Sequence, residues 1–134
     1  MGVDPGTKRV GLAVAGALGI VHPIGFLHAE PRAVLLKKIA AFAADRQCVG
    51  IVVGLPINMD GSEGPAAKAA RALGAEVAAA SGLPVAFSDE RLTSFSAEQK
   101  AGELQLTRKK RKARVDALAA AEILESYLAE QRGF

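Results

Sequence analysis

The sequence predicts an α/β protein with a mixed five-stranded sheet and helices on both faces, and two observations carry this prediction. Residues 1–27 hold three short apolar runs separated by turn residues, a pattern typical of antiparallel strands. The rest of the chain alternates between strand-like and helix-like patterns, which favours parallel strands joined by helices. A chain of 134 residues can build one core of ordinary size. We therefore expect residues 1–134 to form a single domain.

The antiparallel part of the sheet comes first in the chain. Residues 1–4 and 10–15 are the strands of a predicted β-hairpin, with Asp4 at the end of the first strand. Between them, Asp4-Pro5-Gly6-Thr7-Lys8-Arg9 has the composition of a turn, because proline presets one backbone angle and glycine permits a positive φ. Residues 20–27 are expected to form the third strand, in which Pro23 predicts an edge position or an interruption.

Helices and strands alternate in the middle of the chain. A helix is expected to begin at Pro31 and to extend to about residue 46. Residues 49–54 are a continuous apolar run rich in β-branched side chains, which is typical of a central strand buried on both faces. A second helix over residues 65–81 ends before Gly82, which suits a left-handed cap, and residues 83–88 form the last strand.

Two further helices are expected towards the C-terminus. Ser96 and Gln99 resemble a capping box, which begins a helix ending near Leu106. The basic residues that follow are expected to form a loop, and a final helix runs from about residue 115 to residue 130. Asp116 then lies in the first turn of that helix, at the flank of its buried face.

The composition excludes several classes of protein. Cys48 is the single cysteine, so an internal disulfide is excluded, and two histidines cannot complete a typical structural zinc site with it. The longest uncharged apolar stretch, residues 10–21, is interrupted by glycine and too short to cross a bilayer. The chain does not open with the pattern of a secretory signal. We therefore expect a cytoplasmic protein with no membrane association.

Positive charge is concentrated in one segment. The chain has 17 lysine and arginine residues against 14 aspartate and glutamate residues. Six of the basic residues lie between positions 108 and 114, namely Arg108, Lys109, Lys110, Arg111, Lys112 and Arg114. Such a run is expected where a polyanion is contacted at one place, and it is equally typical of a solvated, mobile loop.

Acidic residues at three places in the chain are candidates for a metal site. Asp4 ends the first strand, Asp89 and Glu90 follow the last strand, and Asp116 starts the final helix. In an open sheet, ligands gather outside strand ends, and carboxylates that converge there repel one another unless a cation lies between them. Oxygen ligands without histidine or thiol favour Mg²⁺ or Mn²⁺, and a pair of such ions can promote phosphodiester cleavage.

Each acid also has a structural interpretation. Asp4 could bond the backbone of its own turn. Asp89 could act as a cap or pair with Arg91, and Glu90 could make the same pair. Asp116 is favourable at a helix start through the helix dipole alone. Any one of these acids is more readily explained in this way, so the metal-site hypothesis depends on their convergence.

Two loops contain residues that could contact phosphate. The turn Gly6-Thr7-Lys8-Arg9 presents backbone N–H groups and two cations. Residues 58–63 resemble a turn followed by a helix cap, and the N-terminus of the next helix would face an anionic ligand. Both segments are also explained as ordinary turns.

Four segments carry specific motifs: Asp4-Pro5-Gly6-Thr7-Lys8-Arg9-Val10-Gly11, Gly54-Leu55-Pro56-Ile57-Asn58-Met59-Asp60-Gly61-Ser62, Asp89-Glu90-Arg91-Leu92-Thr93 and Val115-Asp116-Ala117-Leu118-Ala119-Ala120. In this order they resemble the RuvX/YqgF family, described as Holliday junction resolvases and as nucleases of precursor ribosomal RNA. The resemblance implies a ribonuclease H-like (RNase H-like) fold, with Asp4, Glu90 and Asp116 as the catalytic acids that bind metal. Two features depart from the family's pattern: few residues precede Asp4, and Ala15-Gly16 stands where an acid is common.

The leading hypothesis is a divalent-metal-dependent endonuclease that cleaves structured nucleic acid, in Holliday junction resolution, in 5′ processing of pre-16S rRNA, or in both. The cofactor is expected to be Mg²⁺ or Mn²⁺, and the partner a four-way DNA junction or precursor rRNA. We expect nucleic acid to contact Thr7, Lys8, Arg9, Asn58, Ser62, Arg91 and the six basic residues of positions 108–114.

Three points remain open from the sequence. The two-fold symmetry of a junction predicts a homodimer, whereas an RNA substrate does not require one. A non-catalytic nucleic-acid-binding protein that retains the fold is the main alternative function. A phosphotransferase of the actin-like class is a further one, although nucleotide there lies between two lobes and this chain has length for one.

Overall fold

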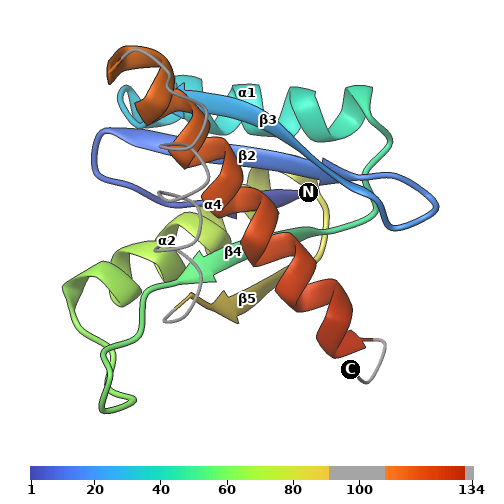
Figure 1. Ribbon diagram of the computed structural model, residues 1–134. Coiled ribbons are helices and arrows are strands. Elements are labelled where there is room, and N and C mark those ends of the chain that lie inside the picture. Colours follow the sequence, from blue (N-terminus) through green and yellow to red (C-terminus); the bar gives the residue numbers. More distant parts are fainter. Residues whose placement is uncertain (91–107, 132–134) are drawn as a thin grey trace.

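Helices pack against both faces of a single β-sheet in the computed structural model, which describes residues 1–90 and 108–131 (Figure 1). Over these residues the five strands lie in the order β3-β2-β1-β4-β5. The strands are β1 Gly2–Asp4, β2 Arg9–Ala15, β3 Val21–His28, β4 Ile51–Leu55 and β5 Val85–Asp89, and the helices are α1 Arg32–Asp45, α2 Pro65–Ser81 and α4 Arg108–Gln131. The helix predicted over residues 96–106 lies outside the described residues.

The sheet is mixed, as the sequence predicts. Strand β2 pairs antiparallel with both β1 and β3, while β4 lies parallel to β1 on one side and to β5 on the other. All five residues of β4 are buried, as expected of a central strand. Strand β3 is at the sheet edge, and its pairing with β2 shifts register between Leu12 and Ala13, opposite the segment with Pro23. Both expectations raised by Pro23 are therefore confirmed.

The two faces of the sheet differ in the size of their side chains. Val3, Leu12 and Val53 point to one face, where α1 and α2 cover the main hydrophobic core. On the other face the strands present small residues beneath α4, because alternate residues of a strand point to opposite faces. A Cβ atom at Gly2 would lie 2.7 Å from the carbonyl oxygen of Ala120 in α4. The absence of side chains there lets the backbone of α4 rest directly on the sheet.

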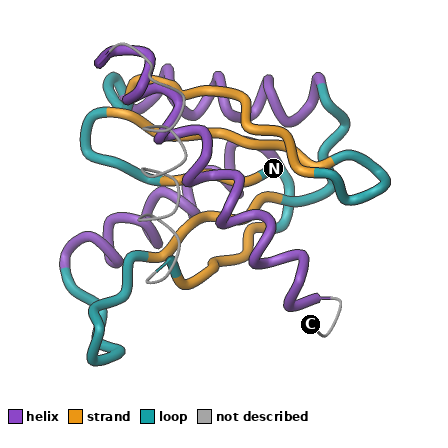
Figure 2. Tube along the Cα trace, viewed as in Figure 1, coloured by secondary structure: helices purple, strands orange, loops and turns teal. Residues whose placement is uncertain are grey.

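Helix α4 begins earlier than the sequence analysis predicts. It starts at Arg108, so the basic segment forms its first turns rather than a loop, and Asp116 lies about two turns into the helix. Lysine, arginine and alanine are good helix formers, and no glycine or proline interrupts residues 108–131. The helix dipole at an N-terminus therefore does not account for Asp116. Figure 2 shows α4 crossing the face of the sheet as one continuous helix.

The remaining boundaries agree with those predicted to within two residues, and those of α2 agree fully. Strand β4 begins at Ile51, and Val49, which the sequence places in the strand, is 88% exposed. Gly82 has the expected left-handed conformation, with φ of 72°, at the end of α2. None of the described helices is long and apolar enough to cross a membrane.

Candidate active site

Asp4 and Glu90 meet at the edge of the sheet where the parallel strands end. Asp4 is the last residue of β1, and Glu90 directly follows β5. The backbone N–H of Glu90 donates to the carbonyl oxygen of Leu55, at the end of β4, with a separation of 3.3 Å. This hydrogen bond holds Glu90 against the central strands, and the side chains of Asp4 and Glu90 are hydrogen-bonded to each other.

Gly54 provides the space that the Glu90 carboxyl group occupies. A Cβ atom at this position would lie 2.9 Å from Oε2 of Glu90 and 2.5 Å from Cδ1 of Ile123 in α4. The carboxyl group therefore lies over the backbone of β4, on the face covered by α4. Any larger residue at Gly54 would push aside the carboxyl group of Glu90 and the end of the Ile123 side chain.

Burial and neighbouring groups change the pKa values of the two acids. Burial raises the pKa of Asp4 from 3.8 to about 6, although the hydrogen bond from Glu90 acts to lower it and the charge of Asp116 adds to the rise. Burial also raises the pKa of Glu90 from 4.5 to about 8, with further contributions from Asp4 and from the charge of Asp89. Near neutral pH, the carboxyl group of Glu90 is therefore protonated and donates a hydrogen bond to the carboxylate of Asp4.

Asp116 approaches the pair from α4, and a glycine again determines the approach. Asp4 is paired with Gly11 of β2, and a Cβ atom at Gly11 would fall on the carbonyl oxygen of Asp116. The carboxylate of Asp116 accepts a hydrogen bond from Nε of Arg9, at 2.6 Å, and is 17% exposed. The structure thus brings Asp4 and Glu90 together and places Asp116 near enough to raise the pKa of Asp4, with its carboxylate held by Arg9.

A cleft of about 500 Å³ opens beside Asp4 and Glu90, and the loop after β4 forms its other wall. Pro56, Ile57, Asn58 and Met59 of that loop line the cleft, and Met59 is 79% exposed. The cleft is large enough to admit part of a polynucleotide strand. The apolar members of this wall were not foreseen, because an exposed methionine in a polar loop gives no signal in a single sequence.

The loop over residues 58–62 is ordered by its own side chains. Nδ2 of Asn58 donates to Oγ of Ser62 at 3.1 Å, and both the backbone N–H and the hydroxyl of Ser62 donate to Oδ1 of Asp60, at 2.9 and 2.6 Å. Asn58 and Ser62 were predicted to contact nucleic acid. In this structure they hold the shape of the loop that lines the cleft.

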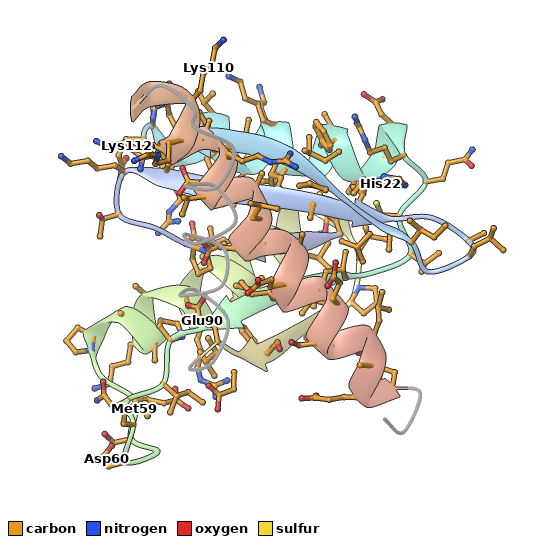
Figure 3. All side chains as sticks on the ribbon, viewed as in Figure 1. His22, Met59, Asp60, Glu90, Lys110 and Lys112 are labelled. Carbon is orange, nitrogen blue, oxygen red and sulfur yellow. The ribbon has the colours of Figure 1, made fainter. Side chains whose placement is uncertain are left out.

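Most of the other residues predicted to contact nucleic acid lie in or beside the turn after β1 and on α4. Thr7 and Lys8 are exposed in the turn after β1, whereas Arg9 is paired with Asp116. Of the basic segment, residues 110–112 are exposed on the first turns of α4, and Arg114 is half-buried. Arg108 and Lys109 are described only as part of the helix. Arg91 lies outside the described residues. In Figure 3, Glu90 lies between Lys112 and Met59 along one side of the molecule.

The donor chemistry of the site fits a hard divalent cation, although the three acids are not all available to it. Carboxylate oxygens are the ligands that Mg²⁺ and Mn²⁺ prefer. Asp4 and Glu90 face each other, and burial raises the pKa of both, so a cation between them would stabilise their charged forms. Within residues 1–90 and 108–131, no group of three acidic, histidine or cysteine side chains is arranged to hold a metal ion, and Asp116 is bound to Arg9.

Comparison with known proteins gives concordant matches over nearly the whole chain. The RuvX family, described as Holliday junction resolvase, matches residues 1–130. A protein of Rhodobacter capsulatus is 42% identical over 128 residues, which is 95% of this chain and 80% of that protein. A protein of Anaeromyxobacter sp. (strain Fw109-5) is 43% identical over 129 residues, 96% of this chain and 94% of that protein. Both bear the name "Putative pre-16S rRNA nuclease".

Solved structures with a similar fold include RuvC of T. thermophilus in complex with a Holliday junction substrate. That chain matches with a TM-score of 0.59 and 18% identity, over 98% of this chain and 94% of RuvC. A second structure of Thermus thermophilus RuvC has a TM-score of 0.55 and 16% identity, over 98% and 95%. Identities this low show the RNase H-like fold alone. The family match over residues 1–130, with relatives 42% and 43% identical, shows that this chain belongs to the RuvX family.

Proposed function

We propose that this protein is a divalent-metal-dependent endonuclease that cleaves phosphodiester bonds in structured nucleic acid. The observation that carries the proposal is the convergence of Asp4, Glu90 and Asp116, from three separate elements, at the sheet edge of a RuvX-family chain. The names of its relatives and the RuvC neighbours support two substrates, precursor 16S rRNA and a four-way DNA junction. We propose that the activity resides in the cytoplasm, and that a homodimer acts on a junction.

The three acids would hold Mg²⁺ or Mn²⁺, beginning with Asp4 and Glu90, whose carboxyl groups already face each other. When bound, the metal would activate the attacking water and stabilise the charge that develops on the departing 3′ oxygen. The residues of the chain perform the other tasks. Burial beneath α4 excludes bulk water from one side of the acids, and release of the shared proton from Glu90 makes both carboxylates available as ligands.

The surface around the acids would hold the nucleic acid. The exposed lysine and arginine side chains of residues 110–112 lie on one side of Glu90, and the loop with Met59 lies on the other (Figure 3). Basic side chains of this kind bind the phosphate backbone without reading its sequence, and their contribution weakens as salt is raised. The ordered loop at residues 58–62 would form the wall against which the strand lies in the cleft.

The proposal is tested by incubating the protein with a labelled four-way junction, a linear duplex and a precursor rRNA fragment, each with Mg²⁺, Mn²⁺ or EDTA. We expect metal-dependent cleavage of the junction or the rRNA, and a loss of about 100-fold or more in Asp4→Asn and Asp116→Asn. Asp45→Asn, an exposed acid at the end of α1, is the matched control and should cleave normally.

The pattern of cleavage distinguishes the substrates. Paired symmetric cuts in the junction establish a resolvase, whereas selective cleavage of the rRNA supports a role in processing. The pairing of Asp116 with Arg9 is the observation that favours the alternative of a non-catalytic binding protein. Binding of all three nucleic acids with no cleavage under any metal condition would refute the endonuclease and support that alternative.

A further inference from the structure

Arg9 is bound to one of the proposed metal ligands. Its Nε donates to Oδ2 of Asp116 at 2.6 Å, and the two residues are 107 positions apart in the sequence. The Arg9 side chain is 30% exposed, and its guanidinium carbon lies 5.9 Å from the centroid of the Phe26 ring. A charge-assisted bond of this length, between partly buried groups, is among the stronger hydrogen bonds in proteins. Arg9 therefore has a defined partner in the protein as it stands.

The position of Arg9 follows from the pattern of β2. Arg9 and Gly11 are two residues apart and point to the same face of the sheet, and Gly11 is the residue on which the backbone of Asp116 rests. The guanidinium is thus placed beside Asp116 by the same contact that brings Asp116 to Asp4. Lys8, one residue earlier, is exposed in the turn and is not equivalent.

The charges make Arg9 a competitor for a bound cation. Asp4, Glu90 and Asp116 form an acidic site, and Arg9 places one positive charge where the carboxylate of Asp116 would otherwise be free. A guanidinium and a divalent cation on the same carboxylate repel each other. Arginine binds phosphate with the same planar fork that it uses for carboxylate, so a phosphate oxygen can replace Asp116 as its partner.

On the basis of the proposed function, we infer that Arg9 exchanges partners during substrate binding. It holds Asp116 in the metal-free protein, and it moves to a phosphate group of the nucleic acid when a divalent cation binds Asp116. Arg9 keeps an anionic partner in both arrangements, so the exchange leaves no partly buried charge unpaired. Arg9 therefore positions Asp116 in the metal-free protein and binds a phosphate group in the complex with nucleic acid and metal.

The first test measures metal binding in the absence of nucleic acid. Mn²⁺ is titrated calorimetrically into the wild type, Arg9→Gln and Arg9→Lys. We expect Arg9→Gln to bind Mn²⁺ about five- to tenfold more tightly, because the competing charge is gone, and Arg9→Lys to lie between it and the wild type. A merely structural bond between β2 and α4 would give unchanged or weaker Mn²⁺ binding in Arg9→Gln, and that result would overturn the inference.

Arg71→Gln is the matched control. Arg71 also binds a carboxylate, donating from Nε to Glu63 at 2.6 Å, and it also lies over a phenyl ring, 5.2 Å from the centroid of Phe87. Its removal should leave Mn²⁺ affinity within about twofold of the wild type. Thermal unfolding in EDTA and in saturating Mn²⁺ checks the fold, and Mn²⁺ should restore more stability to Arg9→Gln than it adds to the wild type.

The second test addresses the exchange to phosphate. Binding of a fluorescein-labelled four-way junction is measured with Ca²⁺ and with EDTA at constant ionic strength. We expect Ca²⁺ to tighten binding by the wild type and by Arg71→Gln more than it tightens binding by Arg9→Gln; an equal gain would overturn the exchange. If the wild type binds no Mn²⁺, both the proposed function and this inference fail, whereas Mn²⁺ binding that Arg9→Gln leaves unchanged refutes only the inference.

Discussion

Replacing Glu90 by glutamine is expected to stabilise the metal-free protein at alkaline pH while abolishing its proposed activity. In the folded protein, burial, with the charge of Asp116, raises the pKa of Asp4 to about 6. Burial, with Asp4 and Asp89, raises that of Glu90 to about 8. In the unfolded chain both groups lose their protons near their ordinary values of 3.8 and 4.5. The folded state therefore binds more protons between these limits, and the free energy of unfolding falls as pH rises from about 4 to 8.

The size of the effect follows from the same values. A pKa of about 8 in place of 4.5 corresponds to about 5 kcal/mol for Glu90 when the whole rise is expressed. The two acids share one proton and water reaches Glu90, so the rises are not additive and are reduced by solvent screening. We expect a gain of about 1–2 kcal/mol for Glu90→Gln at pH 8, or about 3–8 °C in the midpoint of thermal unfolding.

The assay is calorimetric unfolding of the wild type and Glu90→Gln in EDTA at pH 5, 6.5 and 8. The difference between them should be small at pH 5 and should grow with pH, because Asp4 deprotonates in both proteins whereas Glu90 deprotonates only in the wild type. Glu125→Gln is the matched control, since Glu125 is an exposed acid on α4, and its effect should not vary with pH.

Two outcomes would refute this reasoning. A Glu90→Gln protein less stable than the wild type at pH 8, or a difference independent of pH, would mean that the site does not disfavour the charged form of Glu90.

If Glu90→Gln is the more stable protein in EDTA at pH 8, saturating Mg²⁺ should reverse that order. A ligand that binds the folded state stabilises it, and the wild type offers the additional carboxylate.

Three further predictions follow from the packing, the charge and the loop. Gly11→Val should lower the free energy of unfolding in urea by about 2 kcal/mol or more, because its side chain would meet the carbonyl of Asp116. Gly16→Ala is the control and should change that free energy by less than about 0.5 kcal/mol, since its Cβ would meet nothing within 4 Å. Equal losses would contradict the close packing of α4. Exchange of residues 110–112 for glutamine should weaken nucleic-acid binding and reduce the slope of log K against log salt by about 2–3, and an unchanged slope would show that they contact no phosphate. Ser62→Ala should keep the free energy of unfolding within about 0.5 kcal/mol of the wild-type value. It should make residues 58–62 more sensitive to limited proteolysis, since it removes the hydroxyl that donates to Asp60 at 2.6 Å. Unchanged proteolysis would show that this bond does not order the loop.

Most of the sheet is predictable because its signals are local. The turn after Asp4, the apolar run of β4 and the proline of β3 each influence backbone conformation within a few residues, and the structure confirms all three elements. Gly6 does not have the positive φ that the turn composition permits; a Cβ atom there would instead meet the carbonyl oxygen of Arg9. The start of α4 was wrong by seven residues, because a run of like charges suggested a solvated loop. Helix propensity and the continuous packing of α4 outweigh the repulsion within that run.

The site could be predicted only in part, for a different reason. The acids are visible in the sequence, and the motifs indicate that they belong together. The glycines that bring them together are visible too, but Gly11 and Gly54 matter through contacts with Asp116 and Ile123 of α4, which are more than 60 residues away from them in the sequence. The bond between Arg9 and Asp116 spans 107 residues, and a pairwise charge contact at that separation leaves no local pattern.

Because α4 is one uninterrupted helix, it also fixes the distance between the basic residues at its start and Asp116. A helix rises about 1.5 Å per residue, so the basic residues at 110–112 stand about 6–9 Å along its axis from Asp116. The same rod fixes their angular phase, since each residue turns the helix by about 100°. Inserting one residue between Lys112 and Asp116 would keep every charge in the sequence, yet it would rotate the basic residues proposed to bind nucleic acid by about 100° relative to Asp116.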